Sequence, residues 1–413
     1  MSNTPKIRFS GFTENWEQRK LGELGTVQTC KRIFKEQTSE QGDIPFFKNG
    51  TIGLEPDSYI SREVYEEFRR LYPYPEVGDT LISVVGSIGR TAEYTGKDEY
   101  FQDSNVVWLK TDGSINKKFL KISYQVIKWL IEGSTVKHLY NDNILRSEIV
   151  MPVSQIEQAK IAEFFEELDK LITLHQRKYD DTKLLKKYML QKMFPQNGQK
   201  VPEIRFSGFT GDWEQRKLID LVDVLDGDRG KNYPTSDDFD ISGHTLFLNA
   251  SNVTNDGFLF QDNQFITEEK SNSMGNGKLE EDDIVVTSRG SLGHIAWYNA
   301  DISSFVPYAR INSGMLILRN KEEIETEYLY HFMKSSKGQS QISFISFGSA
   351  QPQLTKKGVE DLEVILPTRR DEQVQLGHYF SNLDHLITLH QRKCDELQEL
   401  KKYMLQNMFP QKG

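Results

Sequence analysis

The sequence predicts an α+β protein in which two mixed, strand-rich domains are separated by two long antiparallel helices that form a coiled coil. The first observation is that two different blocks of sequence each occur twice in the 413 residues. The second is that the stretches between these blocks resemble each other only faintly but share a strand pattern. The third is that one block is long, lacks Pro and Gly, and is apolar at every seventh position. We therefore expect a pseudo-twofold internal repeat.

The shorter block begins each half of the chain. Residues 7–21 read IRFSGFTENWEQRKL and residues 204–218 read IRFSGFTGDWEQRKL, so only the two positions before the tryptophan differ. Between the repeated blocks lie two variable inserts, residues 22–150 and 219–364. A constant frame that carries two variable inserts suggests one mechanical task performed on two different targets.

The longer block predicts a helix. No Pro or Gly interrupts residues 154–194, Ser154 is a suitable N-cap, and Pro195 follows the run. Roughly forty residues that rise about 1.5 Å each make a rod of about 60 Å. LITLHQRK at residues 171–178 recurs at 386–393, and KKYMLQ and MFPQ follow in both copies. The sequence therefore predicts a second, matching rod.

A seven-residue stripe predicts that the two rods bury a seam against each other. A twofold relation between the repeats would make them antiparallel. His175 and His390 occupy matching positions of the stripe, where we interpret them as a polar pair that sets the register; catalysis or metal binding is the alternative. The residues assigned to the seam are Ile161, Leu168, His175, Met189, Leu376, Leu383, His390 and Met404.

The order insert, rod, insert, rod is that of a cycle opened at one junction. The first rod runs through FPQNGQKVPEIRF into the second half, while the chain ends with FPQKG and begins with MSNTPKIRF. Joining the two ends would closely reproduce the internal junction. We therefore expect the N-terminus to lie near the end of the second rod.

Within the inserts, residues 79–90 (DTLISVVGSIGR) and 283–294 (DIVVTSRGSLGH) each predict an apolar strand, a Gly-Ser-x-Gly turn and a further strand. We interpret these glycines as hairpin turns, because no helix follows them to complete a phosphate cradle. Near the end of each insert, GSTVKHL at 133–139 matches GSAQPQL at 348–354, and an apolar strand then leads into the rod. The predicted domain boundaries are 1–152, 153–196, 197–367 and 368–413, in the order domain, helix, domain, helix.

Composition limits the class of protein. No window is long and apolar enough for a membrane span, and the N-terminal segment lacks the pattern of a signal peptide. Cys30 and Cys394 stand in non-equivalent contexts, which favours a reducing cytoplasm and argues against disulfides or a cysteine metal site. The net charge of −9 argues against a protein that grips nucleic acid by itself, although basic pairs occur within the inserts.

Motifs of catalysis are missing. The sequence has no GxxxxGK[ST] phosphate loop, no HExxH metal site and no GxSxG elbow, and Val306-Pro307-Tyr308 matches only the end of the tetrapeptide of amino-group DNA methyltransferases. We therefore expect a non-catalytic chain without a metal or a cofactor of its own. A fused methyltransferase or nuclease with an unrecognised motif is the alternative from the enzyme class.

Taken in order, these features resemble the specificity subunit of a type I restriction-modification enzyme. The resemblance rests on the doubled architecture, the WEQRKL start of each insert, the GSIGR and GSLGH turns, and the Pro and Glu-Gln residues before and within each rod (Pro152, Glu157, Gln158, Pro367, Glu372 and Gln373). It implies that each insert is a target-recognition domain that reads one half of an asymmetric bipartite DNA site. The helical pair would then fix the unread gap, in steps of the DNA helix.

The same resemblance implies partners. Two methyltransferase subunits would carry S-adenosylmethionine, and motor-nuclease subunits would carry ATP with magnesium, so that this chain directs adenine methylation or DNA cleavage without catalysing either. The outward faces of the rods, with Trp16 and Trp213, are candidate contacts for the methyltransferase, although both tryptophans could instead be core anchors. A stand-alone DNA-binding scaffold or regulator without these partners is the alternative.

Base readout needs Arg, Lys, Asn, Gln and small hydroxyl side chains on loops that reach a DNA groove. For each candidate, a surface or turn residue without a base contact is the alternative. The candidates of the first insert are Lys31, Arg32, Lys48, Asn49, Thr51, Ser87, Arg90, Lys137 and His138. Those of the second insert are Arg229, Lys231, Asn249, Ser251, Asn252, Arg289, Ser291, Gln351 and Gln353.

Overall fold

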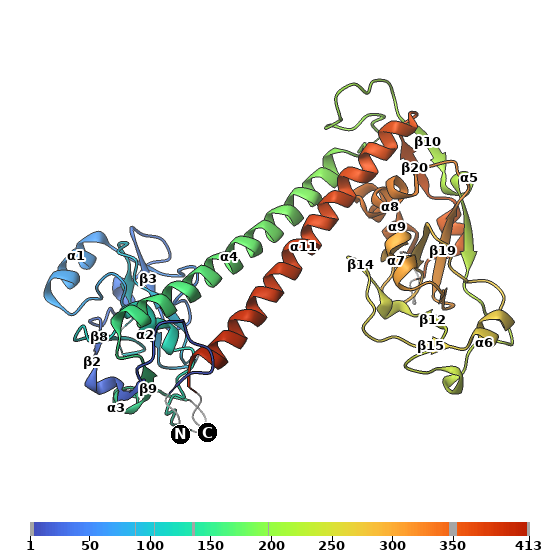
Figure 1. Cartoon of the computed structure of the whole chain (residues 1–413). Coiled ribbons are helices and arrows are strands. Elements are labelled where there is room, and N and C mark those ends of the chain that lie inside the picture. The colour runs from blue at the N-terminus through green and yellow to red at the C-terminus, as the bar shows by residue number, and fades with distance from the viewer. Residues whose placement is uncertain are drawn as a thin grey trace. The chain divides into compact units, whose positions relative to one another are not determined.

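The computed structural model describes residues 4–410 except 87, 103, 134–136, 197 and 347–352. The chain divides into two compact units: the first consists of residues 1–176 and 392–413, and the second of residues 177–391. Each unit contains one mixed domain of helices and strands and about half of each long helix (Figure 1). The predicted α+β class is confirmed. The units do not follow the predicted segments, because both long helices contribute to both units.

The first domain is built on two sheets. One has the strand order β2-β8-β5-β6, and the other has the order β4-β3-β7, in which β3 and β7 are parallel. The strands are β2 Gly25–Thr29, β3 Ile44–Phe47, β4 Tyr59–Ile60, β5 Thr80–Ser83, β6 Thr91–Glu93, β7 Tyr100–Phe101 and β8 Val106–Thr111. The helices are η1 Leu21–Glu23, η2 Lys35–Gln37, α1 Arg62–Leu71, α2 Lys117–Ser123 and α3 Asn141–Arg146.

The second domain repeats this topology. Its sheets have the orders β11-β19-β16-β17 and β15-β12-β18, and β12 and β18 are parallel. The strands are β11 Val222–Asp226, β12 Thr245–Leu248, β15 Phe265–Ile266, β16 Asp283–Thr287, β17 Ile295–Tyr298, β18 Ala309–Ile311 and β19 Met315–Asn320, with the added hairpin β13 Val253–Thr254 and β14 Gly257–Phe258. The helices are α5 Leu218–Leu221, η3 Ser236–Asp238, η4 Ala250–Asn252, α6 Glu268–Ser273, α7 Ala300–Phe305, α8 Thr326–Lys334, α9 Ser336–Ser346 and α10 Lys356–Glu360. The two inserts therefore share one fold, as the strand pattern predicts.

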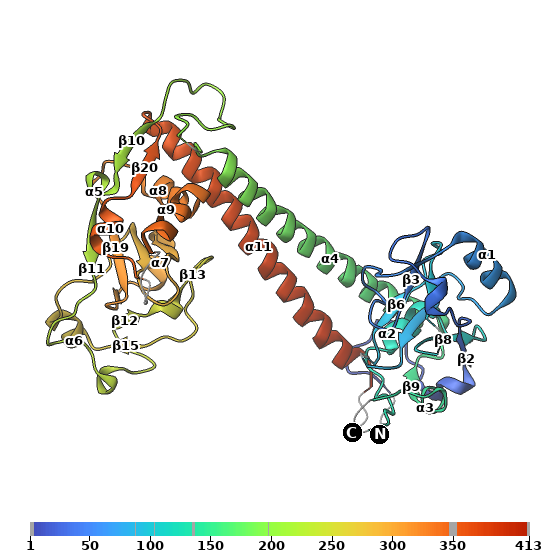
Figure 2. The same ribbon diagram turned by 180° about the vertical axis from the view of Figure 1, so that it is seen from behind.

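The repeated EQRK segment forms the first strand of each domain. β1 (Glu17–Lys20) pairs antiparallel with β9 (Glu148–Met151). In the same way β10 (Glu214–Lys217) pairs antiparallel with β20 (Glu363–Leu366), and Figure 2 shows these two strands side by side. The strand before each long helix is predicted by the sequence, but its pairing with EQRK is not. Each pairing joins the start of a domain to its end, immediately before the long helix.

The long helices are α4 (Gln155–Lys192) and α11 (Arg370–Met408). Ser154 caps α4 as predicted, since its Oγ accepts a hydrogen bond from the amide of Glu157 at 3.4 Å. In the first unit, Lys401 Nζ lies 2.7 Å from Asp169 Oδ1. In the second unit, the matching residues Lys186 and Asp384 form the same cross-helix ion pair. Further along the helices, Phe409 lies against Phe165 in the first unit, and the matching Phe194 lies against Phe380 in the second. Within each unit the two helices therefore run antiparallel, and both units have the same register.

The predicted seam residues divide between the cores of the two units. In the first unit, Ile161 and Leu168 are buried in the core with Leu397, and Met404 is half-buried against it. In the second unit, the buried Leu376 and Leu383 pack with the half-buried Met189. The seam therefore continues the hydrophobic core of each domain. His175 and His390 are half-buried, and their role in the register stays a prediction.

In each unit, the segment that precedes the domain makes the same hydrogen bond to the end of a long helix. The amide of Ile7 donates to the carbonyl of Asn407 at 3.0 Å, and the amide of Ile204 donates to that of Lys192 at 2.9 Å. In Figure 1 the end of α11 lies beside α2 and the start of α4. Phe409 follows α11 and stacks on Phe119 of α2 with ring centroids 5.7 Å apart. The N-terminal segment therefore lies at the end of the second long helix, which confirms the cyclic order.

Both repeated tryptophans are core anchors. In the first unit Glu157 accepts hydrogen bonds from Arg8 Nε at 2.7 Å and from Trp16 Nε1 at 3.3 Å. Arg205, Glu372 and Trp213 make the same contacts in the second unit. Because Trp16 and Trp213 are only 2% and 3% exposed, neither offers a surface to another protein. The interpretation of these two residues as partner contacts is therefore wrong.

No helix among the described residues is long and apolar enough to cross a membrane.

Candidate nucleic-acid interface

In the first domain, two polar loops meet where the central strands end. Residues 48–51 follow β3, and residues 84–90 join β5 to β6. Asn49 ties the loops together, because its side-chain amide donates to the carbonyl of Val85 and accepts from the hydroxyl of Ser83. Arg90 Nη1 donates to the carbonyl of Gly50 at 2.9 Å, so the two sheets hold both loops in one arrangement.

A third loop joins them. The amide of Leu139 donates to the carbonyl of Val84 at 2.9 Å, and the ring of His138 stacks on Tyr140 with centroids 5.5 Å apart. Lys137 is exposed beside them. The second and third loops line a polar cavity of about 680 Å³, whose walls include Val84, Val85, Ser104, Asn105, His138 and Tyr140. The first domain thus presents cations, an imidazole and an exposed aromatic ring at one place.

The second domain repeats the contact between loops with different side chains. The amide of Leu354 donates to the carbonyl of Ser288 at 3.0 Å, which matches the bond from Leu139 to Val84. Arg289 follows Ser288, and its Nε donates to Gln353 Oε1 at 3.2 Å. The fold therefore brings two predicted residues together as a paired donor and acceptor. Guanidinium and amide groups on an accessible loop are suited to reading base edges.

Two further candidates lie close to Arg289. Its amide donates to the carbonyl of Gly314 at 3.2 Å, and Arg229 Nη2 donates to the carbonyl of Ser313 at 3.2 Å, so both arginines hold one turn. A Cβ at Gly290 would lie 3.8 Å from the Cβ of Ala250, which places η4 against the same loop. The second domain therefore gathers Arg229, Arg289, Ser251 and Gln353 in one region.

Asn252 does not suit its predicted role. It is 1% exposed, its Nδ2 donates to the carbonyl of Leu259 at 3.1 Å, and its Oδ1 accepts from the amide of Asn249 at 2.9 Å. Both ends of the amide thus stabilise η4 and the β13–β14 hairpin. Asn49 uses its amide in the same way, as a link between loops. The sequence offers no signal that Asn49 and Asn252 make these internal contacts, and contact of either with DNA stays a prediction.

The other candidates differ in accessibility. Contact with DNA stays a prediction for all of them, and Ser87 and Gln351 lie outside the described residues. The exposed candidates are Lys31, Arg32, Lys137, Arg229, Lys231, Ser251, Arg289, Ser291 and Gln353, and the half-buried ones are Lys48, Asn49, Thr51, Arg90, His138 and Asn249.

Sequence reasoning missed Tyr140 and the turn at Ser313. Tyr140 is 53% exposed and directly follows the GSTVKHL segment, so the match with GSAQPQL was a usable signal. Ser313 gave no signal, because only the folded chain brings it to Arg229.

Over the part of the chain that the structure describes, no three His, Cys, Asp or Glu residues are grouped to hold a metal ion.

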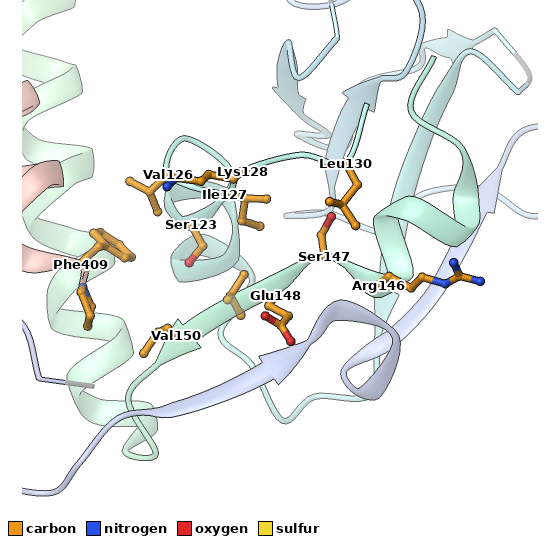
Figure 3. Close-up of a pocket in the computed structure, with 12 residues that line it drawn as sticks. Ser123, Val126, Ile127, Lys128, Leu130, Arg146, Ser147, Glu148, Val150 and Phe409 are labelled. Atoms are coloured by element: carbon orange, nitrogen blue, oxygen red, sulfur yellow. The ribbon is translucent and has the colours of Figure 1, made fainter. Parts of the chain in front are cut away.

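A separate pocket of about 250 Å³ lies on the first domain away from these loops, along the free side of β9. In Figure 3, Glu148 and Val150 project from β9, while Ser123, Val126 and Ile127 form the opposite wall and Phe409 closes one end. Its lining is mainly apolar and lacks a nucleophile paired with a base. This pocket is a gap between the domain wall and the end of α11, and it holds none of the predicted DNA contacts.

Comparison with known protein families shows which family the chain belongs to. The family described as "Type I restriction modification DNA specificity domain" matches residues 13–183 and 210–399, one match for each half. The chain belongs to this type I specificity family. The two matched segments begin just before the repeated WEQRKL sequences and end within the long helices, so the domain of the family includes both the recognition fold and part of its helix.

Relatives of this specificity protein carry the same description. A "Putative type I restriction enzyme specificity subunit S.HindORF215P" from Haemophilus influenzae is 47% identical over 156 residues, which cover 37% of this chain and 40% of the relative. The "Type I restriction enzyme MjaVIII specificity subunit" from Methanocaldococcus jannaschii is 22% identical over 69% of this chain and 67% of the relative. The strong match thus spans well under half of the Haemophilus protein.

Solved structures share the fold. The type I restriction-modification S subunit from M. genitalium has a TM-score of 0.67 and 16% identity, and the match covers 99% of this chain and 100% of that one. A chain from the structure "Structural basis underlying complex assembly andconformational transition of the type I R-M system" has a TM-score of 0.51 at 16% identity over 97% of this chain and 99% of that one. At this identity the likeness concerns the fold alone.

Proposed function

We propose that this chain is the DNA sequence-recognition subunit of a type I restriction-modification complex, in which each domain reads one half of an asymmetric bipartite site. One observation carries the proposal: two domains whose main sheets have the same strand order present different side chains on the loops that make the same backbone contact, Leu139 to Val84 and Leu354 to Ser288. Equal folds with unequal loops favour two related readers of two different half-sites.

Catalysis belongs to partners in this proposal. Methyltransferase subunits supply S-adenosylmethionine, and motor-nuclease subunits supply ATP with magnesium. A base-flipping methyltransferase needs a pocket that holds one extruded base between flat side chains. In the first domain the cavity beside the loops that gather the predicted DNA contacts is open to solvent, and its two rings, His138 and Tyr140, stack on each other, which suits readout of a paired duplex.

The long helices support two equivalent docking surfaces for the methyltransferase. The internal repeat indicates where these surfaces lie. A partner that binds both halves of the chain in the same way needs the same exposed residues on both long helices. Apolar side chains retained at matching positions and exposed to solvent are typical of protein interfaces. Four such pairs occur: Leu171 with Leu386, Leu174 with Leu389, Leu185 with Leu400, and Tyr188 with Tyr403.

The proposal is tested by expressing the chain with a methyltransferase encoded beside it and mapping methylated adenines in the host genome. We expect one asymmetric motif with a fixed unread gap and no methylation by either protein alone. Methyl transfer to DNA by the purified chain with S-adenosylmethionine would contradict the non-catalytic role. Specific DNA binding without a stable complex with the methyltransferase would instead favour a stand-alone regulator.

A further inference from the structure

A cavity of about 300 Å³ in the second unit gathers lysines that the DNA-reading loops do not include. It lies between the end of α4, the start of α11, the end of α8 and the turn of the β13–β14 hairpin. Its charged lining consists of four lysines and two aspartates: Lys183, Lys186, Lys187, Lys334, Asp256 and Asp384. The cavity therefore carries an excess of positive charge.

The two most enclosed cations of the cavity have different partners. Lys186 is 8% exposed, and its Nζ donates to both oxygens of Asp384. Lys334 is half-buried, and its Nζ donates to the hydroxyl of Tyr330 at 3.0 Å. An ammonium has three donors, and the described residues satisfy only one of those on Lys334. This geometry leaves donors of Lys334 available to a ligand.

The electrostatics of the two enclosed lysines favour a nearby anion. Burial lowers the pKa of Lys186, and the charge of Lys334 lowers it further while Asp384 opposes the shift. Burial also lowers the pKa of Lys334, against the effects of Asp384 and Asp256. A bound anion would relieve this repulsion between the ammonium groups. The first turn of α9 begins at Ser336 in the cavity wall, and its positive end favours an anion there.

The first unit provides a natural comparison. At the same place on α11, a cavity of about 370 Å³ is lined by Gln398, Lys401 and Lys402, which match Lys183, Lys186 and Lys187. The domain wall there offers Gln125 and Val126 in place of Lys334. Two lysines thus line the cavity in the first unit and four line it in the second. Because Asp256 and Asp384 offset two of the four lysines, both linings carry a net excess of two positive charges. Specific to the second unit are the added lysines Lys183 and Lys334, where the first unit has Gln398 and Gln125.

We propose that this lysine cavity binds a phosphate group, with Lys183, Lys187 and Lys334 as its donors. Two sources have this chemistry: a phosphodiester of bound DNA or a free phosphate ion. The assignment to DNA rests on the proposed function and on position, because the hairpin that contributes Asn255 and Asp256 begins immediately after η4, which carries the candidate Ser251. The cavity would then hold the DNA backbone beside a base-reading loop without reading sequence.

The first arm of the test measures the Tm of the full chain in sodium phosphate and in sodium chloride of equal ionic strength. We expect phosphate to raise the Tm of the wild type more than chloride does. Lys183→Met should reduce this difference, and Lys183→Met with Lys334→Met should abolish it. Lys402→Met, the first-unit match of Lys187, should keep it. Lys183 is exposed on α4, so its variant remains informative even if the change at Lys334 impairs folding.

The second arm measures the affinity of the full chain for a mixed-sequence DNA duplex against salt concentration. The logarithm of the binding constant falls linearly with the logarithm of the salt concentration, and each lost phosphate contact makes this fall less steep by about 0.9. A less steep fall for the double variant assigns the cavity to DNA. An unchanged slope with a lost phosphate effect assigns it to a free anion.

If phosphate raises the wild-type Tm no more than chloride and the slope is also unchanged, the proposal is wrong. The Tm arm needs no DNA, so it still decides about the cavity if recognition of a bipartite site fails.

Discussion

At the scale of single residues, the repeated sequence is explained by burial. Arg8 and Trp16 both reach Glu157, which lies in the first turn of α4, and the carboxylate is almost fully enclosed. A buried charge is tolerated when it is paired and hydrogen-bonded, and removing one member leaves the others unsatisfied. The near-identical sequence of the repeated blocks thus preserves a buried link between the first segment of each domain and its long helix.

Glu157→Ala should therefore destabilise the first unit by about 3 kcal/mol, since the half-buried Arg8 guanidinium and the buried Trp16 ring nitrogen both lose their carboxylate partner. The measurement is the urea unfolding of the full chain, followed by tryptophan fluorescence. Glu163→Ala is the matched control, because Glu163 is exposed on the same helix. Equal stability of the two variants would show that the ion pair does not hold the helix to the domain.

Readout of bases also belongs to this scale. Arg289→Ala should relax the motif at one position of a single half-site and cost about 1–3 kcal/mol in binding of the preferred base. The measurement is the frequency of each base at methylated sites in cells that carry the variant. Arg369→Ala, which removes an exposed arginine paired with Asp371, should leave the motif unchanged. A uniform loss of methylation over all sites would instead indicate a phosphate contact.

At the scale of elements, the long helices have two different kinds of apolar surface. Buried positions such as Leu168 and Leu383 extend the domain cores, whereas Leu174 and Leu389 remain exposed. The heptad stripe predicts the buried set, because residues on one face of a helix meet the opposite helix. The exposed set becomes visible only when burial is known, since both sets belong to the same repeated block.

Leu174→Asp and Leu389→Asp should each remove one methyltransferase from the complex, and the double variant should remove both. A charge at the centre of an apolar interface is costly to desolvate, while an exposed position tolerates it. Native mass spectrometry of the co-purified proteins measures the stoichiometry. Leu184→Asp is the control, because Leu184 is 68% exposed and its repeat counterpart is Glu399. Two bound copies on the double variant would exclude this surface.

At the scale of the whole molecule, the two domains and the two long helices follow one another in a cyclic order: domain, helix, domain, helix. The amide of Ile7 meets Asn407 as the amide of Ile204 meets Lys192, so the two junctions are equivalent. The strand pairs β1-β9 and β10-β20 then close each domain on itself. Each recognition domain is therefore a module that is inserted into the frame between two fixed points.

Exchange of residues 22–150 for the matching insert of another family member should change one half of the methylated motif and leave the other half and the gap unchanged. The retained β1 can pair with the counterpart of β9 that the new insert brings, and the second domain keeps its own loops. Methylome mapping again provides the measurement. A change in both halves would contradict independent reading by the two domains.

The sequence by itself determined the internal repeat, the two long helices, the hairpins around Gly86 and Gly290, and the shared fold of the inserts. These features follow from local periodicity and from internal comparison, which need no knowledge of distant contacts. Tertiary structure alone decided that Trp16 and Trp213 are anchors, that Asn252 is enclosed, and that Arg289 meets Gln353. It also decided that Lys334 joins the lysines of α4. Burial and side-chain pairing depend on residues far apart in the chain, so no local pattern encodes them.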